Sequence, residues 1–478
     1  MENEIRPAEA LYEKVAADIE KLITRKVLCA GEKVPSVRML SREQGVSMST
    51  VFQAYYLLEN KGLIEARPRS GYYVRQSRRK PLPEPGITLT EYRPSEVSVA
   101  DAYSGLMKQI KDRDLVDLSV ATPSQALIPV AKLKKSIQQV LRQNNGGSFL
   151  YGFPPGDPAL LRQIARQSFE WGGNVAPDDI IVTNGCVEAL NLCLRTVARR
   201  GDTIVIESPT YYGILQSIES LGLKVVEVAT DSATGVCLDE LEKVLDRTRP
   251  AACLFVLNFN NPLGSCMPDD KKEKLVHMLA ERNIPLIEDD IYGDLYFGKK
   301  RPRTAKSFDK KGLVLHCSSF SKSISPGFRI GWTIPGIYRE KVERLKFMTS
   351  ISTPPLLQEA MAVFLENGRY HNHLKALRLA YQVQVRRYSE AISLHFPAGT
   401  KISRPEGGFV LWVELPGIDS FLLSKKAMEH QVTFTPGVLF TAGQRYSDCL
   451  RISCGQPWSR EIEDAIRKIG TLAKAFLI

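Results

Sequence analysis

The chain has 478 residues, of which 44% are hydrophobic and 24% are charged, and its formal net charge is +11. This length exceeds what one hydrophobic core usually serves, so we expect a globular protein with two or more domains. No apolar run approaches the ~18 residues that span a bilayer, and the charged start with Glu2, Glu4 and Arg6 is not that of a secretory signal, so we expect a cytoplasmic protein with no membrane partner.

The first segment predicts a winged helix-turn-helix. Apolar side chains recur at helical spacing over residues 9–26, and two shorter helices should follow, one opened by Pro35-Ser36 and one over about residues 49–60. Residues 63–74 then predict a β-hairpin whose turn, Arg67-Pro68-Arg69-Ser70-Gly71, is doubly basic. Two short helices joined by a tight glycine turn are typical of DNA-binding proteins, and a basic hairpin tip suits phosphates or the minor groove.

Positive charge is concentrated in this segment, because the first 80 residues hold 15 Lys+Arg against 10 Asp+Glu. That excess suits a polyanion such as double-stranded DNA as the partner. Residues 11–74 resemble the GntR family of bacterial regulators, and the matching stretches are Pro35-Ser36-Val37-Arg38-Met39-Leu40-Ser41, Val46-Ser47-Met48-Ser49-Thr50-Val51, Leu57-Leu58-Glu59-Asn60-Lys61-Gly62-Leu63-Ile64 and Arg69-Ser70-Gly71-Tyr72-Tyr73-Val74.

The resemblance to the GntR family implies which residues lie near DNA. These are Arg38, Ser49, Thr50, Gln53, Arg67, Arg69 and Gly71. The family usually has arginine where Met48 stands, so one phosphate or base contact of the family is in question and the site read can differ. Tyr56 lies near the same face, where an aromatic side chain serves packing as readily as binding.

The next segment predicts a linker. Arg78-Arg79-Lys80-Pro81-Leu82-Pro83-Glu84-Pro85-Gly86 is charged and rich in proline, which favours an extended or semi-rigid tether. We therefore expect a winged helix-turn-helix over residues 1–75, a linker over residues 76–114 and a large domain over residues 115–478.

The large domain alternates short apolar runs with helical stretches. The runs that predict buried strands are residues 179–183, 203–206, 224–228, 253–257, 285–288 and 313–317. Such alternation predicts an α/β domain with a largely parallel sheet covered by helices on both faces. Ligands of such sheets bind at the carboxyl ends of the strands.

Residues with useful chemistry follow several of these runs. Asn184-Gly185-Cys186 enters a helix, where free backbone N–H groups can bind phosphate. Tyr211 can stack on a heterocycle or serve in the core, and Asn261 lies in an Asn-Pro-x-Gly turn, which is common without function. Asp289 could keep a pyridine nitrogen protonated or belong to a solvated acidic loop, and Arg451 could grip a carboxylate or form a structural salt bridge.

The stretch Ser319-Phe320-Ser321-Lys322, followed by Arg329, is the most specific signal in the chain. A lysine that attacks carbonyls needs a lowered pKa, and pyridoxal 5'-phosphate (PLP) supplies a carbonyl together with a phosphate that Ser319 and Arg329 could bind. Ser-x-x-Lys also occurs in penicillin-binding enzymes, but their Ser-Asp-Asn and Lys-Thr-Gly partners do not occur here.

Residues 115–478 resemble the fold-type I PLP-dependent aminotransferases. The resemblance rests on Tyr151-Gly152 with Pro155-Gly156, the Asn-Pro-x-Gly turn, Asp-x-x-Tyr, Ser-x-x-Lys with its following arginine, and the late Arg-Ile-Ser. It implies a mostly parallel sheet domain with a smaller C-terminal α+β subdomain. The cofactor-binding residues that it implies are Tyr151, Gly185, Cys186, Tyr211, Asn261, Asp289, Tyr292, Ser319, Lys322 and Arg329.

The resemblance also implies a role for each residue. Lys322 is the catalytic residue and binds PLP covalently, Asp289 pairs with the pyridine nitrogen, and Arg451 binds the substrate carboxylate. Tyr292 and Asn261 bond the phenolic oxygen while Tyr211 stacks on the ring. The phosphate lies against Gly185, Cys186, Ser319 and Arg329, with Tyr151 reaching it from the neighbouring subunit. Many relatives have glutamine near Val187 and Glu188, so we expect the Glu188 side chain to point away from the phosphate.

A GntR-like reader joined to an aminotransferase-like domain resembles the MocR subfamily of transcription regulators over nearly the whole chain. This resemblance implies a homodimer in which each reader crosses to the partner's large domain. The first hypothesis is a PLP-dependent transcription regulator that binds DNA and senses PLP or an amino compound. The alternative is a catalytically active amino-acid aminotransferase with an appended DNA-binding module. A third option is a PLP-binding architectural protein without regulation.

Cysteine usage fits a reducing compartment. The nine cysteines are scattered, with no Cys-x-x-Cys pair, and the six histidines are not clustered with them. We therefore expect reduced thiols and no metal site.

Overall fold

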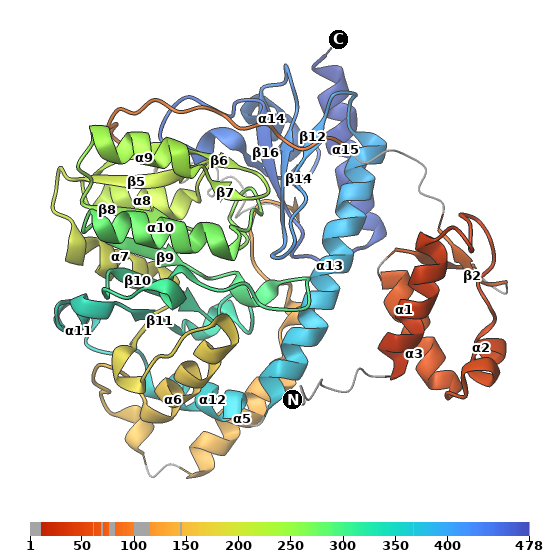
Figure 1. The fold of residues 1–478 in the computed structure, drawn as a ribbon, viewed down its shortest axis with the longest axis horizontal. Helices are drawn as coiled ribbons and strands as arrows, with labels where there is room; N and C mark the ends of the chain where they lie inside the picture. The colour runs from red at the N-terminus through yellow and green to blue at the C-terminus, as the bar shows by residue number, and fades with distance from the viewer. Residues whose placement is uncertain are drawn as a thin grey trace, which may run out of the picture. The chain divides into compact units, whose positions relative to one another are not determined.

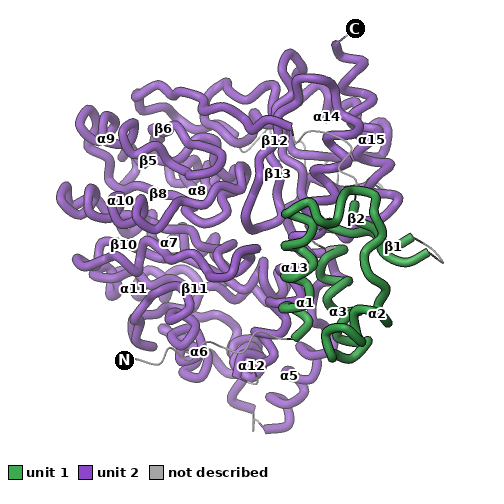
Figure 2. Tube along the Cα trace, turned by 45° about the vertical axis from the view of Figure 1, so that its right-hand side comes forward, with its two compact units in different colours: residues 1–81 green, residues 82–478 purple. Residues whose placement is uncertain are grey.

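Figure 1 shows the fold of the computed structural model, coloured along the chain. The structure describes residues 11–60, 62–67, 70–75, 82–99, 115–143, 146–366 and 368–477. The chain divides into two compact units, residues 1–81 and residues 82–478 (Figure 2). Each unit has a hydrophobic core of its own.

The described part of the smaller unit is a helix-turn-helix followed by a hairpin. Its elements are α1 (Leu11–Thr24), α2 (Val37–Gln44), α3 (Met48–Asn60), β1 (Ile64–Arg67) and β2 (Gly71–Val74). Helix α2 begins after Ser36, whose Oγ accepts a hydrogen bond from the Met39 N–H at 3.2 Å, and ends at Gly45 in the left-handed region. The two strands pair antiparallel, with Ile64 opposite Val74. The winged helix-turn-helix expected from the sequence is confirmed.

The larger unit is built on a sheet that contains, among the described residues, eight strands in the order β4-β11-β10-β9-β8-β5-β6-β7. These strands are β4 (Ile181–Thr183), β5 (Thr203–Ser208), β6 (Lys224–Asp231), β7 (Gly235–Val236), β8 (Ala252–Phe255), β9 (Leu286–Asp289), β10 (Val314–Ser319) and β11 (Gly331–Ile334). The neighbours from β10 to β6 run parallel, whereas β11 pairs antiparallel with β10 and β4, and β7 with β6. The expected α/β domain with a mostly parallel sheet is confirmed.

Helices cover both faces of this sheet (Figure 1). Successive side chains of a strand point to opposite faces. Ile204 and Ile206 of β5 pack in a cluster with residues of α7 (Cys186–Val197) and α8 (Tyr212–Ser220). Val205 packs instead with residues of α9 (Leu238–Arg247) and α10 (Asp269–Glu281). Because both faces are buried, these strands appear in the sequence as uninterrupted apolar runs.

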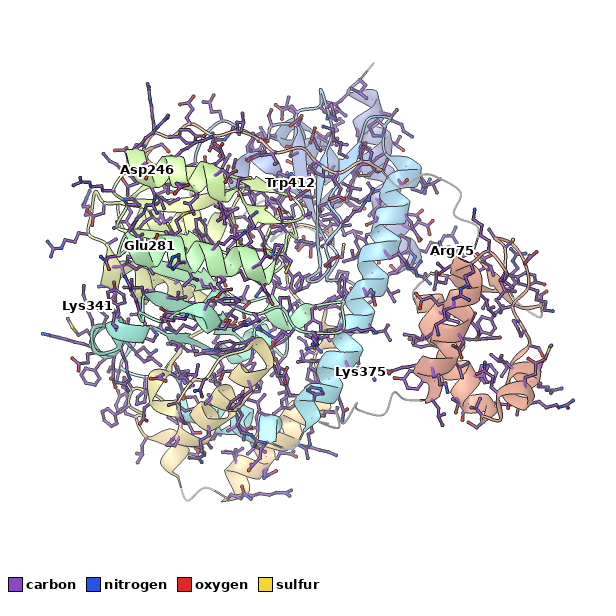
Figure 3. The ribbon with its side chains drawn as sticks, in the orientation of Figure 1. Arg75, Asp246, Glu281, Lys341, Lys375 and Trp412 are labelled. Atoms are coloured by element: carbon purple, nitrogen blue, oxygen red, sulfur yellow. The ribbon has the colours of Figure 1, made fainter. Side chains whose placement is uncertain are left out.

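The C-terminal part is the expected α+β subdomain. Its antiparallel sheet has the order β12 (Lys401–Ile402), β13 (Val410–Glu414), β16 (Cys449–Ser453) and β15 (Thr435–Pro436). The helices of this part are α13 (Arg369–His395), α14 (Ser420–Glu429) and α15 (Arg460–Ala475). Trp412 of β13 is buried, whereas Asp246, Glu281 and Lys341 of the sheet domain are exposed (Figure 3).

Two short strands join the segment that begins at residue 115 to the C-terminal part of the large unit. Strand β3 (Val116–Asp117) pairs in parallel with β14 (Val432–Thr433), which carries residues 118–122 toward the C-terminal sheet. The other α-helices among the described residues of this unit are α5 (Val130–Gln143), α6 (Pro158–Ser168), α11 (Arg339–Ser350) and α12 (Pro355–Glu366).

Residues 82–99, which the sequence places in the linker, lie along the large unit. Ser95 and Val225 of β6 exchange two backbone hydrogen bonds of 2.9 Å, and Val97 and Val99 are buried beside α7 and α8. The Pro83 carbonyl accepts a hydrogen bond of 2.9 Å from the backbone of β12. This stretch is therefore held by backbone pairing and apolar burial rather than by charge alone.

Within the part of the chain that the structure describes, no helix has the length and apolar character needed to cross a membrane. Nor do three or more His, Cys, Asp or Glu side chains gather among these residues in a way that could hold a metal ion. The nine cysteines carry free thiols, and most of them are buried.

Candidate functional site

Lys322 lies just beyond the carboxyl end of β10, where it is half-buried. Its Nζ donates a hydrogen bond to the Ala121 carbonyl at 2.5 Å. Burial first, and then the positive charge of Arg451, lower the pKa of the Lys322 amine to about 8, although the carboxylate of Asp289 opposes this change. A lysine in this state has a substantial fraction of neutral, nucleophilic amine near neutral pH.

Asp289 ends the neighbouring parallel strand, where it pairs in register with Cys317 of β10. Its side chain is buried, and its Oδ1 accepts hydrogen bonds from the Ile291 N–H at 3.2 Å and from the Cys186 thiol at 3.4 Å. Burial raises the pKa of Asp289 to about 6, against the effect of those two donors. The carboxylate therefore carries a negative charge at neutral pH in a site that favours a nearby cation.

Tyr292 and Asn261 form a polar pair beside the lysine. The ring centroid of Tyr292 lies 5.9 Å from Lys322 Nζ, and both Tyr292 and Asn261 are buried. The Asn261 side chain hydrogen-bonds the Tyr292 hydroxyl, which lowers the pKa of that hydroxyl, but burial dominates and raises it above its ordinary value. Two polar groups from different strand ends are thus held within reach of one ligand atom.

Arg451, in the middle of β16, is completely buried. Its guanidinium donates to the Asn261 Oδ1 at 3.1 Å, to the Thr435 Oγ1 at 2.9 Å and to the Ser119 carbonyl. Its Nε has no hydrogen-bond partner in the part of the chain that the structure describes. Among the described residues the guanidinium forms no ion pair with a carboxylate. A buried guanidinium whose neutral partners leave its charge unbalanced is suited to bind an anionic group of a ligand.

A candidate phosphate cradle lies at the N-terminus of α7. Gly185 precedes the helix with φ +83°, and having no side chain it cannot itself cap the free N–H groups of the first turn. The Arg329 guanidinium donates to the Asn184 carbonyl at 2.9 Å, and a Cβ on Gly185 would collide with that guanidinium. A helix N-terminus beside an arginine fits a phosphate group.

The serines of the lysine motif complete this cradle. Ser319 is buried and its Oγ accepts a hydrogen bond from the Ser321 N–H at 3.3 Å. The Ser321 Oγ is also buried, and it has no hydrogen-bond partner among the described residues. An unsatisfied buried hydroxyl is costly, so this atom fits a site that receives polar ligand atoms. The residues present therefore fit PLP.

Three other expected residues differ in their surroundings. Tyr211 is half-buried with its ring centroid 4.6 Å from that of Tyr212. Tyr151 is 78% exposed, so within this chain its side chain lies open to solvent rather than in the buried cluster. Glu188 is held by the Lys346 Nζ and the Ser350 Oγ, each at 2.7 Å, on α11.

Several residues of the cluster escaped the sequence analysis. Ser119 and Ala121 contribute backbone carbonyls, and Thr435 contributes a hydroxyl from the edge of the C-terminal sheet. Backbone carbonyls cannot be predicted from residue types, because every residue has one. Only Tyr212, whose ring centroid lies 5.9 Å from the Arg451 guanidinium, could have been found, since it follows Tyr211 directly.

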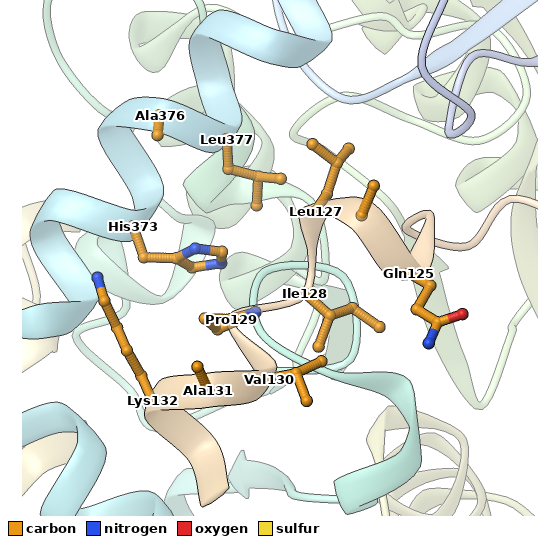
Figure 4. Close-up of a pocket in the computed structure, with 11 residues that line it drawn as sticks. Gln125, Leu127, Ile128, Pro129, Val130, Ala131, Lys132, His373, Ala376 and Leu377 are labelled. Carbon is orange, nitrogen blue, oxygen red and sulfur yellow. The ribbon is translucent and has the colours of Figure 1, made fainter. Parts of the chain in front are cut away.

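A hollow of about 600 Å³ lies between the start of α5 and α13 (Figure 4). It is lined by residues 125–132 and by His373, Ala376 and Leu377 of α13. The His373 Nε2 is 2.7 Å from the carbonyl of Ser323, the residue after Lys322. The hollow therefore adjoins the backbone that carries the lysine, while the polar cluster lies elsewhere.

In the smaller unit, the expected DNA contacts Arg38, Ser49, Gln53 and Arg67 are exposed, and Thr50 is half-buried. Gly71 is exposed at φ +104°, and Arg69 lies outside the described residues. The Arg67 guanidinium is 4.2 Å from the ring centroid of Tyr73 across the hairpin and pairs with Glu65 at 3.0 Å.

Comparison with known proteins separates the chain into the same two parts. Residues 11–74 match the family of bacterial regulatory proteins named gntR, and residues 113–469 match class I and II aminotransferases. Over 460 residues the chain is 38% identical to the uncharacterized HTH-type transcriptional regulator YjiR of Escherichia coli K12, and the match covers 96% of this chain and 98% of YjiR.

Two solved aminotransferase structures each resemble about four fifths of the chain. The Pyrococcus horikoshii kynurenine aminotransferase, in complex with PMP, is 27% identical with a TM-score of 0.74, covering 79% of this chain and 95% of that one. LysN, the α-aminoadipate aminotransferase of Thermus thermophilus, complexed with N-(5'-phosphopyridoxyl)-L-leucine, is 27% identical with a TM-score of 0.72, covering 80% and 99%. The fold around Lys322 is thus one in which relatives hold pyridoxyl compounds.

Proposed function

This chain belongs to the family of HTH-type transcriptional regulators that join a GntR-type domain to a class I and II aminotransferase domain, and from that premise we propose that it is a cytoplasmic, PLP-dependent regulator. The smaller unit binds double-stranded DNA, and the larger unit binds PLP and senses PLP or a small amino compound. The observation that carries this proposal is Lys322, whose pKa of about 8 and position beside Asp289 suit an amine that captures an aldehyde.

Each residue of the cluster has a task in this proposal. When bound, PLP supplies an aldehyde that reacts with amines and a ring that withdraws electrons. Lys322 presents a neutral amine and afterwards carries a proton, and Asp289 holds a proton at the ring nitrogen. Tyr292 and Asn261 donate to the phenolic oxygen, and Arg451 orients the carboxylate of an incoming amino compound.

The remaining assignments concern the phosphate and the ring face. Gly185, Cys186, Ser319 and Arg329 would hold the phosphate, and Tyr211 would cover the ring. Glu188 would not bind the phosphate, because its carboxylate accepts hydrogen bonds from Lys346 and Ser350 of α11 and from the Asn184 N–H.

A homodimer is part of the proposal. Phe149, Leu150, Tyr151 and Phe153 are 73%, 70%, 78% and 65% exposed, and the ring of Phe153 stacks on the exposed Phe347 at 6.5 Å. An apolar surface of this kind favours association with a second copy. Association would also bring Tyr151 to the partner's phosphate, as the family resemblance implies.

Regulation requires that the ligand bind two arrangements of the protein with different affinity. The proposal is therefore that an amino compound, by engaging Lys322 and Arg451, changes how the DNA-binding units are held. Transaminase activity is the second candidate function. It is favoured by the buried Arg451, whose charge no carboxylate among the described residues balances.

Absorbance and DNA retention test the proposal together. Wild-type protein incubated with PLP should gain a visible absorbance band, and PLP or a suitable amino compound should change its retention on DNA. Lys322→Ala should lose the band while keeping the fold, whereas Lys132→Ala, an exposed lysine at the hollow of Figure 4, should keep it. A band that persists in Lys322→Ala would disprove the lysine assignment. Steady turnover of an amino acid with a keto acid, without any effect on DNA, would favour the enzyme instead.

A further inference from the structure

The exposed face of α3 is apolar. Val51, Ala54, Tyr55 and Leu58 turn toward the core of the smaller unit and are fully buried. On the other side Met48, Phe52 and Tyr56 are 51%, 52% and 61% exposed. Because these three residues are spaced four apart, they form one continuous ridge along the helix, here called the α3 stripe.

Polar groups border the α3 stripe without covering it. Ser49 and Gln53 are exposed on the adjoining part of the helix surface. At the helix start the Ser47 Oγ accepts a hydrogen bond from the Thr50 N–H at 3.1 Å and lies 2.7 Å from the Ser49 Oγ. The hydroxyls are thus engaged with one another, and the largest side chains that α3 presents outward are the three of the stripe.

The surroundings of the stripe indicate DNA as its occupant. Helix α3 is the second helix of the helix-turn-helix, the position that enters the major groove in this motif. Lys33, Arg38 and Arg42 are exposed on the same unit, as is Arg67 of the hairpin, and these cations suit flanking phosphates. The phosphates at the edges of the major groove suit these cations, and the apolar ridge between the cations requires an apolar group on the base edges of the groove.

Only one apolar group is displayed in the major groove, and that is the C5-methyl group of thymine. We propose that the α3 stripe reads thymine methyl groups, so that the half-site is specified at these positions by T·A pairs. Both kinds of base pair display three polar groups in the major groove, so a G·C pair is disfavoured only because it lacks the methyl group that the apolar side chains would contact. Arginine at position 48 would bind guanine, and Met48 cannot.

This inference rests on the proposed DNA-binding function and is tested by removing the methyl group alone. Sites are first selected from a random duplex library with the full-length protein and PLP. Each thymine of the selected site is then replaced by deoxyuridine, which keeps every hydrogen-bonding group. Replacement under the stripe should weaken binding about fourfold per methyl group, which corresponds to about 0.8 kcal/mol for one buried carbon.

Variants connect the methyl groups to named side chains. Phe52→Ala should weaken binding and abolish the effect of deoxyuridine at one position of the half-site. Met48→Arg should shift the selected base toward guanine. Leu11→Ala is the matched control, since Leu11 is an apolar residue of α1 that is 63% exposed, and it should change neither affinity nor selectivity.

The outcomes separate the two levels of the proposal. If no duplex is enriched, the DNA-binding function fails and the inference with it. If duplexes are enriched but tolerate deoxyuridine at every thymine, methyl reading alone is overturned. If Phe52→Ala leaves DNA binding unchanged but lowers the melting temperature or weakens self-association in sedimentation, the stripe serves a contact within or between protein chains. That result would also overturn the inference.

Discussion

Lys322 should react as a neutral amine at a pH at which an ordinary exposed lysine is almost fully protonated. With a pKa of about 8, about a quarter of the Lys322 amines are neutral at pH 7.5, against about one in a thousand for a lysine at 10.5. The amine should therefore be acetylated about 200-fold faster than its exposed counterparts at equal intrinsic reactivity. Pulsed acetic anhydride on PLP-free protein between pH 6 and pH 11, read out by peptide mass spectrometry, gives the midpoint of this reaction.

Two variants should move this midpoint in opposite directions. Arg451→Met removes a positive charge that lowers the pKa of Lys322, so the midpoint should rise, while burial continues to hold it below the ordinary value. Asp289→Asn removes a negative charge that raises this pKa, so the midpoint should fall. Lys346, which is paired with Glu188, serves as a control in the same digest and should not respond. A wild-type midpoint at or above pH 10, or shifts of equal sign in the two variants, would refute the electrostatic reasoning.

The remaining predictions concern the cradle, the DNA contact and a buried acid. Gly185→Ala should release PLP more readily in dialysis, since the new Cβ would collide with the Arg329 guanidinium, whereas Gly201→Ala, also at positive φ but with no atom near its Cβ, should retain PLP. Arg38→Ala should weaken DNA binding and reduce the slope of log affinity against log salt concentration by about 0.9. An unchanged slope would show that Arg38 does not contact a phosphate. Burial raises the pKa of Glu207 to about 8 from 4.5, so the folded state binds more protons than the unfolded chain between these values and stability falls as pH rises through them. Wild-type protein should lose about 3 kcal/mol of stability through this group between pH 6 and pH 9, whereas Glu207→Gln should not. Thermal midpoints of the two proteins that stay parallel across this range would contradict the assignment.

The strands of the main sheet could be predicted from the sequence, because strands buried on both faces consist of consecutive apolar residues. Each of the six apolar runs became a strand of the main sheet. Strand β11 (Gly331–Ile334) was not predicted, because it is short and directly follows the motif of Lys322 and Arg329, which we interpreted as a binding site. Its Gly331 packs directly against Gly185, and no local sequence pattern predicts this contact between distant segments.

The candidate site was predictable only where side chains mark it. Asp289 and Asn261 follow apolar runs in recognisable turns, so their placement at strand ends could be inferred from local sequence. The carbonyls of Ser119 and Ala121 could not, because any residue supplies a carbonyl and their approach depends on the pairing of β3 with β14. The role of Tyr151 depends on a second chain and stays a prediction.

Those two carbonyls bear on how the proposed regulation could operate. The Ala121 carbonyl accepts a hydrogen bond from Lys322 and the Ser119 carbonyl accepts one from Arg451, so both candidate ligand-binding cations also hold the segment that follows β3. That segment follows residues 82–99, which are themselves fastened to β6 and β12. A ligand shifts an equilibrium only through contacts that differ between the two states. A compound that binds the Lys322 amine and the Arg451 guanidinium competes with these two hydrogen bonds. Its binding would loosen the segment around Ser119 and Ala121, which continues along the chain toward the DNA-binding unit.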